Sequence, residues 1–151
     1  MRSNDEIERF QENIGLIRKI LGMSEKELAE SIGVTRQTIN SIANKKYTLT
    51  RTQYLAMRMI IEDEKKDSPK ENEMLAYVID VLVDNPENYT KKDKEKVLEM
   101  ANLLAPAIIT KSNSKKEVSK QFMGILGALG IAAGTITLAI LTGKGPKGGK
   151  K

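Results

Sequence analysis

Four residues with hydrogen-bonding side chains are spaced so that they share one face of a short helix: Arg36, Gln37, Asn40 and Ser41. Arginine forms paired hydrogen bonds with guanine, and glutamine and asparagine form paired hydrogen bonds with adenine. These residue types at this spacing therefore predict side chains that read base edges in the major groove of DNA.

A second group of residues flanks this helix and suits phosphates. Basic and short polar side chains bind phosphate oxygens and fix the register on a duplex without reading its sequence. The predicted phosphate contacts are Thr35, Asn44, Lys45, Lys46 and Arg51. The local charge agrees, because the interval from Ser31 to Ile61 has no acidic residue but includes Arg36, Lys45, Lys46, Arg51 and Arg58.

Two short helices with clear end signals position these side chains. Ser24 and Glu27 have the spacing of a capping box, and Gly33 is expected to end the first helix with a positive φ. Thr35 caps the second helix, which should run to about Ala43. A small core is expected to hold Val34 and Ile39 with Leu28, Ile42 and Leu55. Two helices joined by a tight turn predict a helix-turn-helix.

Residues from about 13 to 61 resemble the phage repressor-like (Cro/cI, XRE) family of helix-turn-helix DNA-binding domains. The resemblance rests on Leu28-Ala29, Gly33-Val34, Thr35, Gln37-Thr38-Ile39 and Lys45-Lys46. It implies a five-helix, lambda-repressor-like domain that binds a palindromic operator as a homodimer, with Arg36, Gln37 and Ser41 reading bases. Three residues depart from the family pattern. Glu25 and Lys26 stand where a glutamine commonly touches phosphate, and Asn44 stands where a glycine usually follows the recognition helix, although asparagine also tolerates a left-handed backbone.

Apolar residues at helical spacing predict an all-α chain beyond this domain as well. The DNA-binding domain is expected to occupy residues 1–66, with one unbroken first helix from about Asp5 to Leu21. Residues 70–109 predict a helical hairpin that breaks at Asn85-Pro86, ends before Pro106 and serves dimerisation or regulation. Residues 110–119 are expected to be a polar basic linker.

The C-terminal part of the sequence is apolar and then basic. Residues 120–143 predict an apolar helix long enough for a bilayer core of about 30 Å. Small residues at Gly124, Ala128, Gly130 and Gly134 predict close helix packing inside a membrane. Residues 144–151 form a basic tail of glycine and lysine. A membrane anchor is the favoured interpretation, and a helix buried in an oligomer is the alternative.

The composition excludes several kinds of chemistry. The 151-residue chain has no Cys and no His, which removes disulfides, thiolate nucleophiles, histidine acid–base catalysis and the usual zinc ligand sets. We predict no catalytic residue, no metal and no cofactor, and we do not expect an enzyme. The net charge of +5 comes from residues 111–151, which hold eight Lys and only Glu117 as an acid.

These features together predict a sequence-specific DNA-binding transcriptional regulator of prokaryotic or phage type, acting as a repressor. Its expected partners are double-stranded DNA and a second copy of the chain. The DNA-binding domain would lie in the cytoplasm, attached to the inner membrane through residues 120–143. One alternative is an antitoxin or immunity-type protein whose C-terminal half binds a protein or membrane partner. Another is a tail that assembles into a pore.

Overall fold

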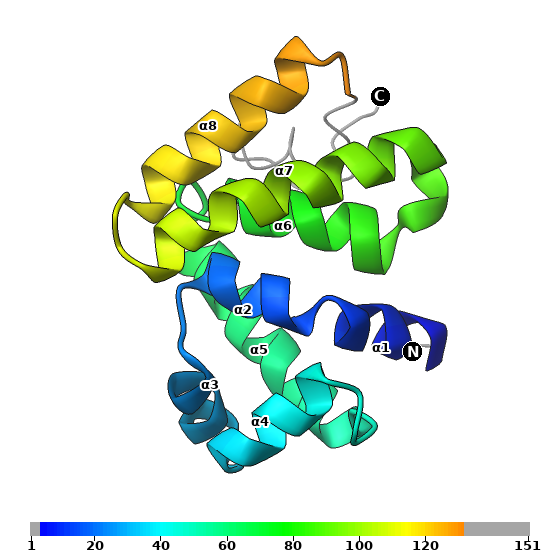
Figure 1. Ribbon diagram of the computed structural model, residues 1–151, viewed down its shortest axis with the longest axis vertical. Helices are drawn as coiled ribbons and strands as arrows, with labels where there is room; N and C mark the ends of the chain where they lie inside the picture. The colour runs from blue at the N-terminus through cyan, green and yellow to red at the C-terminus, as the bar shows by residue number, and fades with distance from the viewer. Residues whose placement is uncertain (1–3, 132–151) are drawn as a thin grey trace.

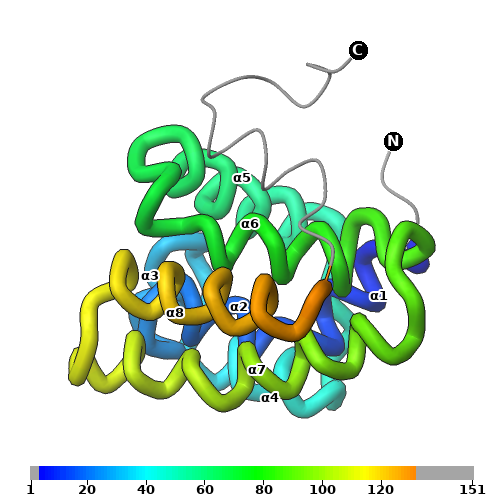
Figure 2. The backbone as a smooth tube through the Cα atoms, turned by 90° about the horizontal axis from the view of Figure 1, so that it is seen from above, coloured from blue at the N-terminus to red at the C-terminus, as the bar shows by residue number. Residues whose placement is uncertain are grey.

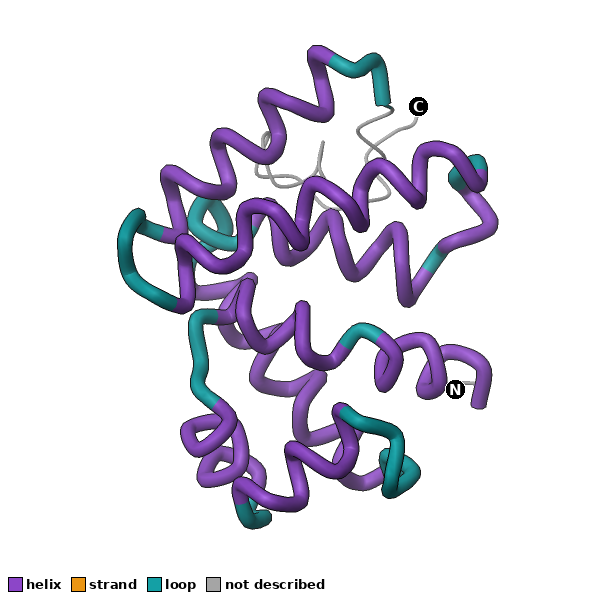
Figure 3. The backbone as a smooth tube through the Cα atoms, viewed as in Figure 1, coloured by secondary structure: helices purple, strands orange, loops and turns teal. Residues whose placement is uncertain are grey.

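The computed structural model describes residues 4–131, and every regular element in that range is a helix (Figures 1 and 3). The all-α prediction is therefore confirmed for this part of the chain. The elements are α1 (Asn4–Glu12), α2 (Ile14–Leu21), α3 (Glu25–Ile32), α4 (Arg36–Ala43), α5 (Arg51–Asp67), α6 (Glu73–Ile79), the π-helical segment η1 (Asp80–Asp84), the 3-10 turn η2 (Pro86–Asn88), α7 (Lys91–Ile109) and α8 (Lys115–Ala128).

The helices form two layers that share one core. In Figure 1, α6, α7 and α8 lie above α1 to α5, and Figure 2 shows the same chain from above. The layers meet where α2 packs against α6 and α7, and where α1 packs against η1. Helix α6 is buried along its whole length. The first helix of the predicted hairpin thus has its apolar side chains covered within the chain.

The predicted end signals of the helix-turn-helix are confirmed. The Ser24 hydroxyl accepts a hydrogen bond from the Glu27 backbone N–H at 3.0 Å, and the Glu27 carboxylate accepts one from the Ser24 N–H at 2.8 Å. Gly33 adopts φ +77° and ends α3. Thr35 caps α4 by accepting from the backbone N–H of Thr38 at 3.1 Å. Local capping chemistry therefore fixes the angle between α3 and α4.

The predicted first helix is in fact two helices. The break lies at Asn13, whose φ of −111° and ψ of 12° leave the helical region. Its side-chain amide donates to the carbonyl of Arg9 at 2.8 Å and takes the place of a backbone donor. Residues 4–67 consequently hold five helices, the number that the family resemblance implies.

The prediction that the second hairpin helix ends before Pro106 is wrong. Helix α7 continues through this proline to Ile109. Ala105 and Ile108 are buried on either side of it, while Pro106 itself is exposed. Burial of the last turn therefore outweighs the backbone hydrogen bond that a proline removes.

The predicted linker and the start of the predicted apolar helix form one helix, α8. It begins at Lys115, inside the segment 110–119, and the Ser114 hydroxyl caps it. Its apolar side packs on α6 and α7 through the buried Val118, Phe122 and Leu126. The Phe122 ring meets that of Tyr77 edge to face, with centroids 6.2 Å apart.

A continuous helix over residues 120–143 is also wrong. Helix α8 ends at Ala128, and Gly130 follows with φ +75°. The Ile131 N–H donates back to the Leu126 carbonyl at 3.0 Å, which closes the helix end in the manner of a Schellman motif. Gly124, Ala128 and Gly130, predicted to pack helices in a membrane, are exposed.

The remaining predictions for the tail fall beyond the structure. Gly134 and residues 144–151 lie outside the described residues. Between residues 4 and 131, no helix has both the length and the apolar composition needed to cross a bilayer.

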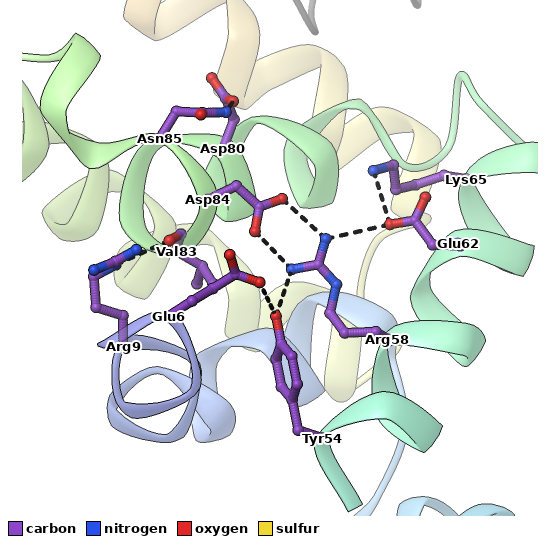
Figure 4. Close-up of polar contacts among 10 residues, drawn as sticks. All are labelled: Glu6, Arg9, Tyr54, Arg58, Glu62, Lys65, Asp80, Val83, Asp84 and Asn85. Carbon is purple, nitrogen blue, oxygen red and sulfur yellow. Dashed lines mark hydrogen bonds and ion pairs between the residues drawn. The ribbon is translucent and has the colours of Figure 1, made fainter. Parts of the chain in front are cut away.

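A buried ion pair ties the two layers together (Figure 4). Arg58 of α5 is 5% exposed and binds Asp84 of η1 through two hydrogen bonds, Nη1 to Oδ1 at 2.7 Å and Nη2 to Oδ2 at 2.9 Å. Burial lowers the pKa of Arg58, but the Asp84 hydrogen bonds and charge, with Tyr54 and Glu62, raise it above its ordinary value. Arg58 is therefore charged and is not part of a DNA-facing basic surface. The expected core position of Leu55 is also wrong, since this side chain is 47% exposed.

Candidate nucleic-acid interface

Helix α4 separates its apolar and polar residues onto two faces. Ile39 and Ile42 are buried against the rest of the domain. The predicted base-reading residues Arg36, Gln37 and Asn40 are exposed, and Ser41 is half-buried. The helix thus presents a polar face with donors and acceptors to solvent.

Four of the predicted DNA contacts converge at the N-terminal end of α4. Thr35, Arg36, Gln37 and Asn40 line one open hollow on the surface. The N-terminus of a helix also carries partial positive charge, which favours phosphate nearby. Ser41 does not line this hollow. Its backbone carbonyl instead accepts from the N–H groups of the following loop, including that of Lys46 at 2.8 Å.

An acidic side chain from α3 holds two of these residues. The Glu25 carboxylate lies 3.6 Å from the Nε of Arg36 and accepts a hydrogen bond from the Asn40 amide at 3.3 Å. The Arg36 side chain is 72% exposed, whereas that of Glu25 is 23% exposed. The Asn40 carbonyl oxygen in turn accepts from the Asn44 amide at 3.1 Å. Three predicted DNA contacts are therefore linked to one carboxylate.

The loop after α4 takes its left-handed residue at Lys45. Asn44, which was expected to tolerate this conformation in place of glycine, has φ −93°, and Lys45 has φ +62°. The turn thus lies one residue later than expected. Lys45 and Lys46 are exposed, and the Lys45 ammonium group lies 3.9 Å from the Glu12 carboxylate. Exposed pairs of this kind contribute little to stability, so the ammonium group can exchange Glu12 for a phosphate.

Gln11 of α1 fixes this loop, and the sequence analysis did not identify it. Its amide donates to the carbonyls of Ile42 at 3.0 Å and Tyr47 at 2.7 Å, and its carbonyl oxygen accepts from the Leu49 N–H at 3.0 Å. The side chain is buried, on the same face as Ile7 and Ile14. A glutamine at the helical spacing of buried apolar residues was the available signal.

Arg51, the last predicted phosphate contact, opens α5. It is exposed and directly follows Thr50, which caps the helix by accepting from the Gln53 N–H at 3.1 Å.

Within residues 4–131, no group of three or more acidic side chains is arranged to hold a metal ion.

Capped helices at a fixed angle, a polar outward face on the second helix and a basic loop after it define a helix-turn-helix DNA-binding domain. A family model described as helix-turn-helix matches residues 14–56. This match supports the resemblance of the segment to the phage repressor-like (Cro/cI, XRE) helix-turn-helix family, and it supports a DNA-binding transcription regulator of this type. No curated protein and no solved structure matches the chain.

Proposed function

We propose that this protein is a sequence-specific transcriptional repressor of prokaryotic or phage type that acts in the cytoplasm. The observation that carries the proposal is the hollow formed by Thr35, Arg36, Gln37 and Asn40 at the exposed end of α4. Base edges would enter there, while Lys45 and Lys46 would meet the flanking phosphates.

Base-reading and phosphate-binding residues can be told apart by substitution. We expect Arg36→Ala or Gln37→Ala to cost about 1–3 kcal/mol of binding to the preferred duplex and to relax selectivity at one base pair each. Lys46→Ala should weaken all duplexes about equally and reduce the slope of log K against log[salt] by about one. Fluorescence anisotropy with a duplex selected from a randomised pool and with its scrambled version measures both. Unchanged sequence preference in the two α4 variants would exclude α4 as the reading helix.

We further propose that the repressor binds DNA as a homodimer, as is typical of the family. Leu55 and Met59 lie one turn apart on α5, in the same layer as α4, and both are exposed. A contact in this layer would let both copies of α4 face one duplex, with half-sites about 34 Å apart. Met59→Glu should shift the protein towards monomer in analytical ultracentrifugation. Leu103→Glu, on an exposed site of α7 in the other layer, should not.

The proposal does not include a membrane anchor. Val118, Phe122 and Leu126, which a bilayer-spanning helix would turn to lipid, are covered by α6 and α7. Alkaline carbonate extraction of the membrane fraction tests this point. We expect the full-length chain in the supernatant, and a pellet signal that disappears on deletion of residues 132–151 would contradict the expectation.

A protein partner for the C-terminal half has one observation in its favour. Leu98 and Leu103 of α7 and Leu129 after α8 are large apolar side chains that are exposed. An antitoxin-type protein would cover them with its target, and the Leu103→Glu variant would then lose that partner while keeping its affinity for DNA.

A further inference from the structure

We propose that Glu25 determines the sequence specificity of this protein by positioning Arg36 and Asn40. The carboxylate directs these two side chains to base edges and keeps them away from phosphates. This inference rests on the proposed function, because it concerns how the same face of α4 discriminates between DNA sequences.

The carboxylate is held in place by the backbone around it. Glu25 is the first residue of α3, directly after the Ser24 N-cap, so it lies within the turn that the capping box of Ser24 and Glu27 closes. Gly33, in its left-handed conformation, sets the angle at which α4 follows. A side chain in this capped first turn of α3 can therefore fix the position of a longer, more exposed side chain on α4.

The contacts use both oxygens of the carboxylate. One oxygen pairs with the Nε of Arg36, and the other accepts from the Asn40 amide. Among residues 4–131, Arg36 has no other polar side-chain partner. The two terminal amino groups of its guanidinium remain available, and they present the donor fork that matches the acceptors of guanine.

The charge of Glu25 has a second effect. Cationic side chains on an exposed protein surface ordinarily bind the phosphates of a DNA duplex, because these are its most abundant hydrogen-bond acceptors. A carboxylate in contact with Arg36 opposes this use, because a phosphate approaching the guanidinium would also approach Glu25. A neutral glutamine would impose no such repulsion and could itself donate to the phosphate. Glu25 therefore lowers non-specific affinity and raises discrimination, as repulsive elements do in specific interfaces.

The test compares Glu25→Gln with a matched control on the same helix. Glu30→Gln removes the same charge from an exposed residue of α3 that contacts neither Arg36 nor Asn40. Each variant is titrated with the selected duplex, its single-base variants and its scrambled version. Since the Glu25 contacts are exposed, Glu25→Gln should fold normally, which circular dichroism verifies.

We expect Glu25→Gln to bind the scrambled duplex roughly three- to tenfold more tightly at about 0.1 M salt, with a salt slope steeper by about one. Discrimination at the base pair read by Arg36 should fall by about tenfold. Glu30→Gln should leave that discrimination unchanged. In an Arg36→Ala background, Glu25→Gln should also leave it unchanged, which identifies Arg36 as the residue through which Glu25 acts.

Two results would overturn the inference while leaving the proposed function standing. One is wild-type discrimination in Glu25→Gln at every base pair. The other is an equal loss of discrimination in Glu30→Gln, or in Glu25→Gln made in the Arg36→Ala background. Either would indicate a general effect of charge. If the wild-type chain selects no sequence from the pool, the proposed function fails, and this inference fails with it.

Discussion

Glu73 brings a carboxyl group into the buried first turn of α6, where its side chain is 8% exposed. Burial raises the pKa of this carboxyl above its ordinary value, although the charge of Lys70 acts in the opposite direction. The folded state therefore holds its proton to higher pH than the unfolded state does. Between the ordinary carboxyl pKa and the raised one, stability must fall as the pH rises.

We accordingly expect Glu73→Gln to raise the Tm at pH 7, because above the ordinary carboxyl pKa ionisation favours the unfolded wild-type chain and glutamine does not ionise. The gain should vanish as the pH falls below the ordinary carboxyl pKa, since Glu73 is then protonated in both states. Thermal denaturation at several pH values measures the difference. Glu71→Gln, at an exposed position two residues earlier, is the control. An equal gain at acid and neutral pH would mean that charge burial is not its cause.

At the scale of one element, the turn between α3 and α4 depends on Gly33. A Cβ at this position would meet nothing within 4 Å, so only the positive φ of +77° opposes it. Gly33→Ala should cost about 1–2 kcal/mol of unfolding free energy. Gly15→Ala, inside α2 and also free of contacts, should instead stabilise by up to about 1 kcal/mol. Urea denaturation measures the free energy of unfolding of both variants. A loss of stability in both would indicate steric clashes, which the structure does not show at either position.

The loop after α4 is the second element that depends on a single side chain. Gln11→Leu would remove the side-chain partner of the Tyr47 carbonyl and of the buried Leu49 N–H, while the Ile42 carbonyl would keep its hydrogen bond from the Lys45 N–H. We expect a loss of about 1–3 kcal/mol of unfolding free energy. DNA affinity should fall through the loosened Lys45 and Lys46 while base preference is retained. A changed base preference would place the effect of Gln11 in α4 itself.

The elements that the sequence predicts well are those whose ends are set locally. Ser24, Gly33 and Thr35 determine the helix-turn-helix within a few residues, and all three adopt the expected roles. The errors arise where tertiary packing decides. Pro106 stays within α7 because its neighbours are buried, and the apolar run after residue 120 begins as a core helix because α6 and α7 cover it.

The candidate site likewise has a part that the sequence predicts and a part that depends on tertiary contacts. The polar face of α4 follows from helical periodicity and could be predicted. The contacts of Glu25 and Gln11 could not, because they join residues that lie 11 to 38 positions apart in the sequence. Arg58 was counted among surface cations for the same reason, since its partner Asp84 is 26 positions away.

At the scale of the whole molecule, Arg58 and Asp84 join the two layers. Asp84→Ala would leave the guanidinium buried without its main partner and should cost about 3–5 kcal/mol of unfolding free energy. An Arg58→Met, Asp84→Leu double variant should regain much of this loss, because no buried charge remains. Chemical denaturation followed by circular dichroism measures both. The exposed pair of Lys96 and Glu99 on α7 is the control, and its loss should change stability by less than about 0.5 kcal/mol.

Lys45 has a left-handed backbone, which a glycine would adopt without strain, and it carries an ammonium group, which a glycine would lack. Selection for stability and selection for DNA binding therefore favour different residues at this one position. In lineages that have stopped binding DNA, glycine should replace Lys45 early and without harm to the fold. In lineages that bind DNA, lysine should persist despite its backbone.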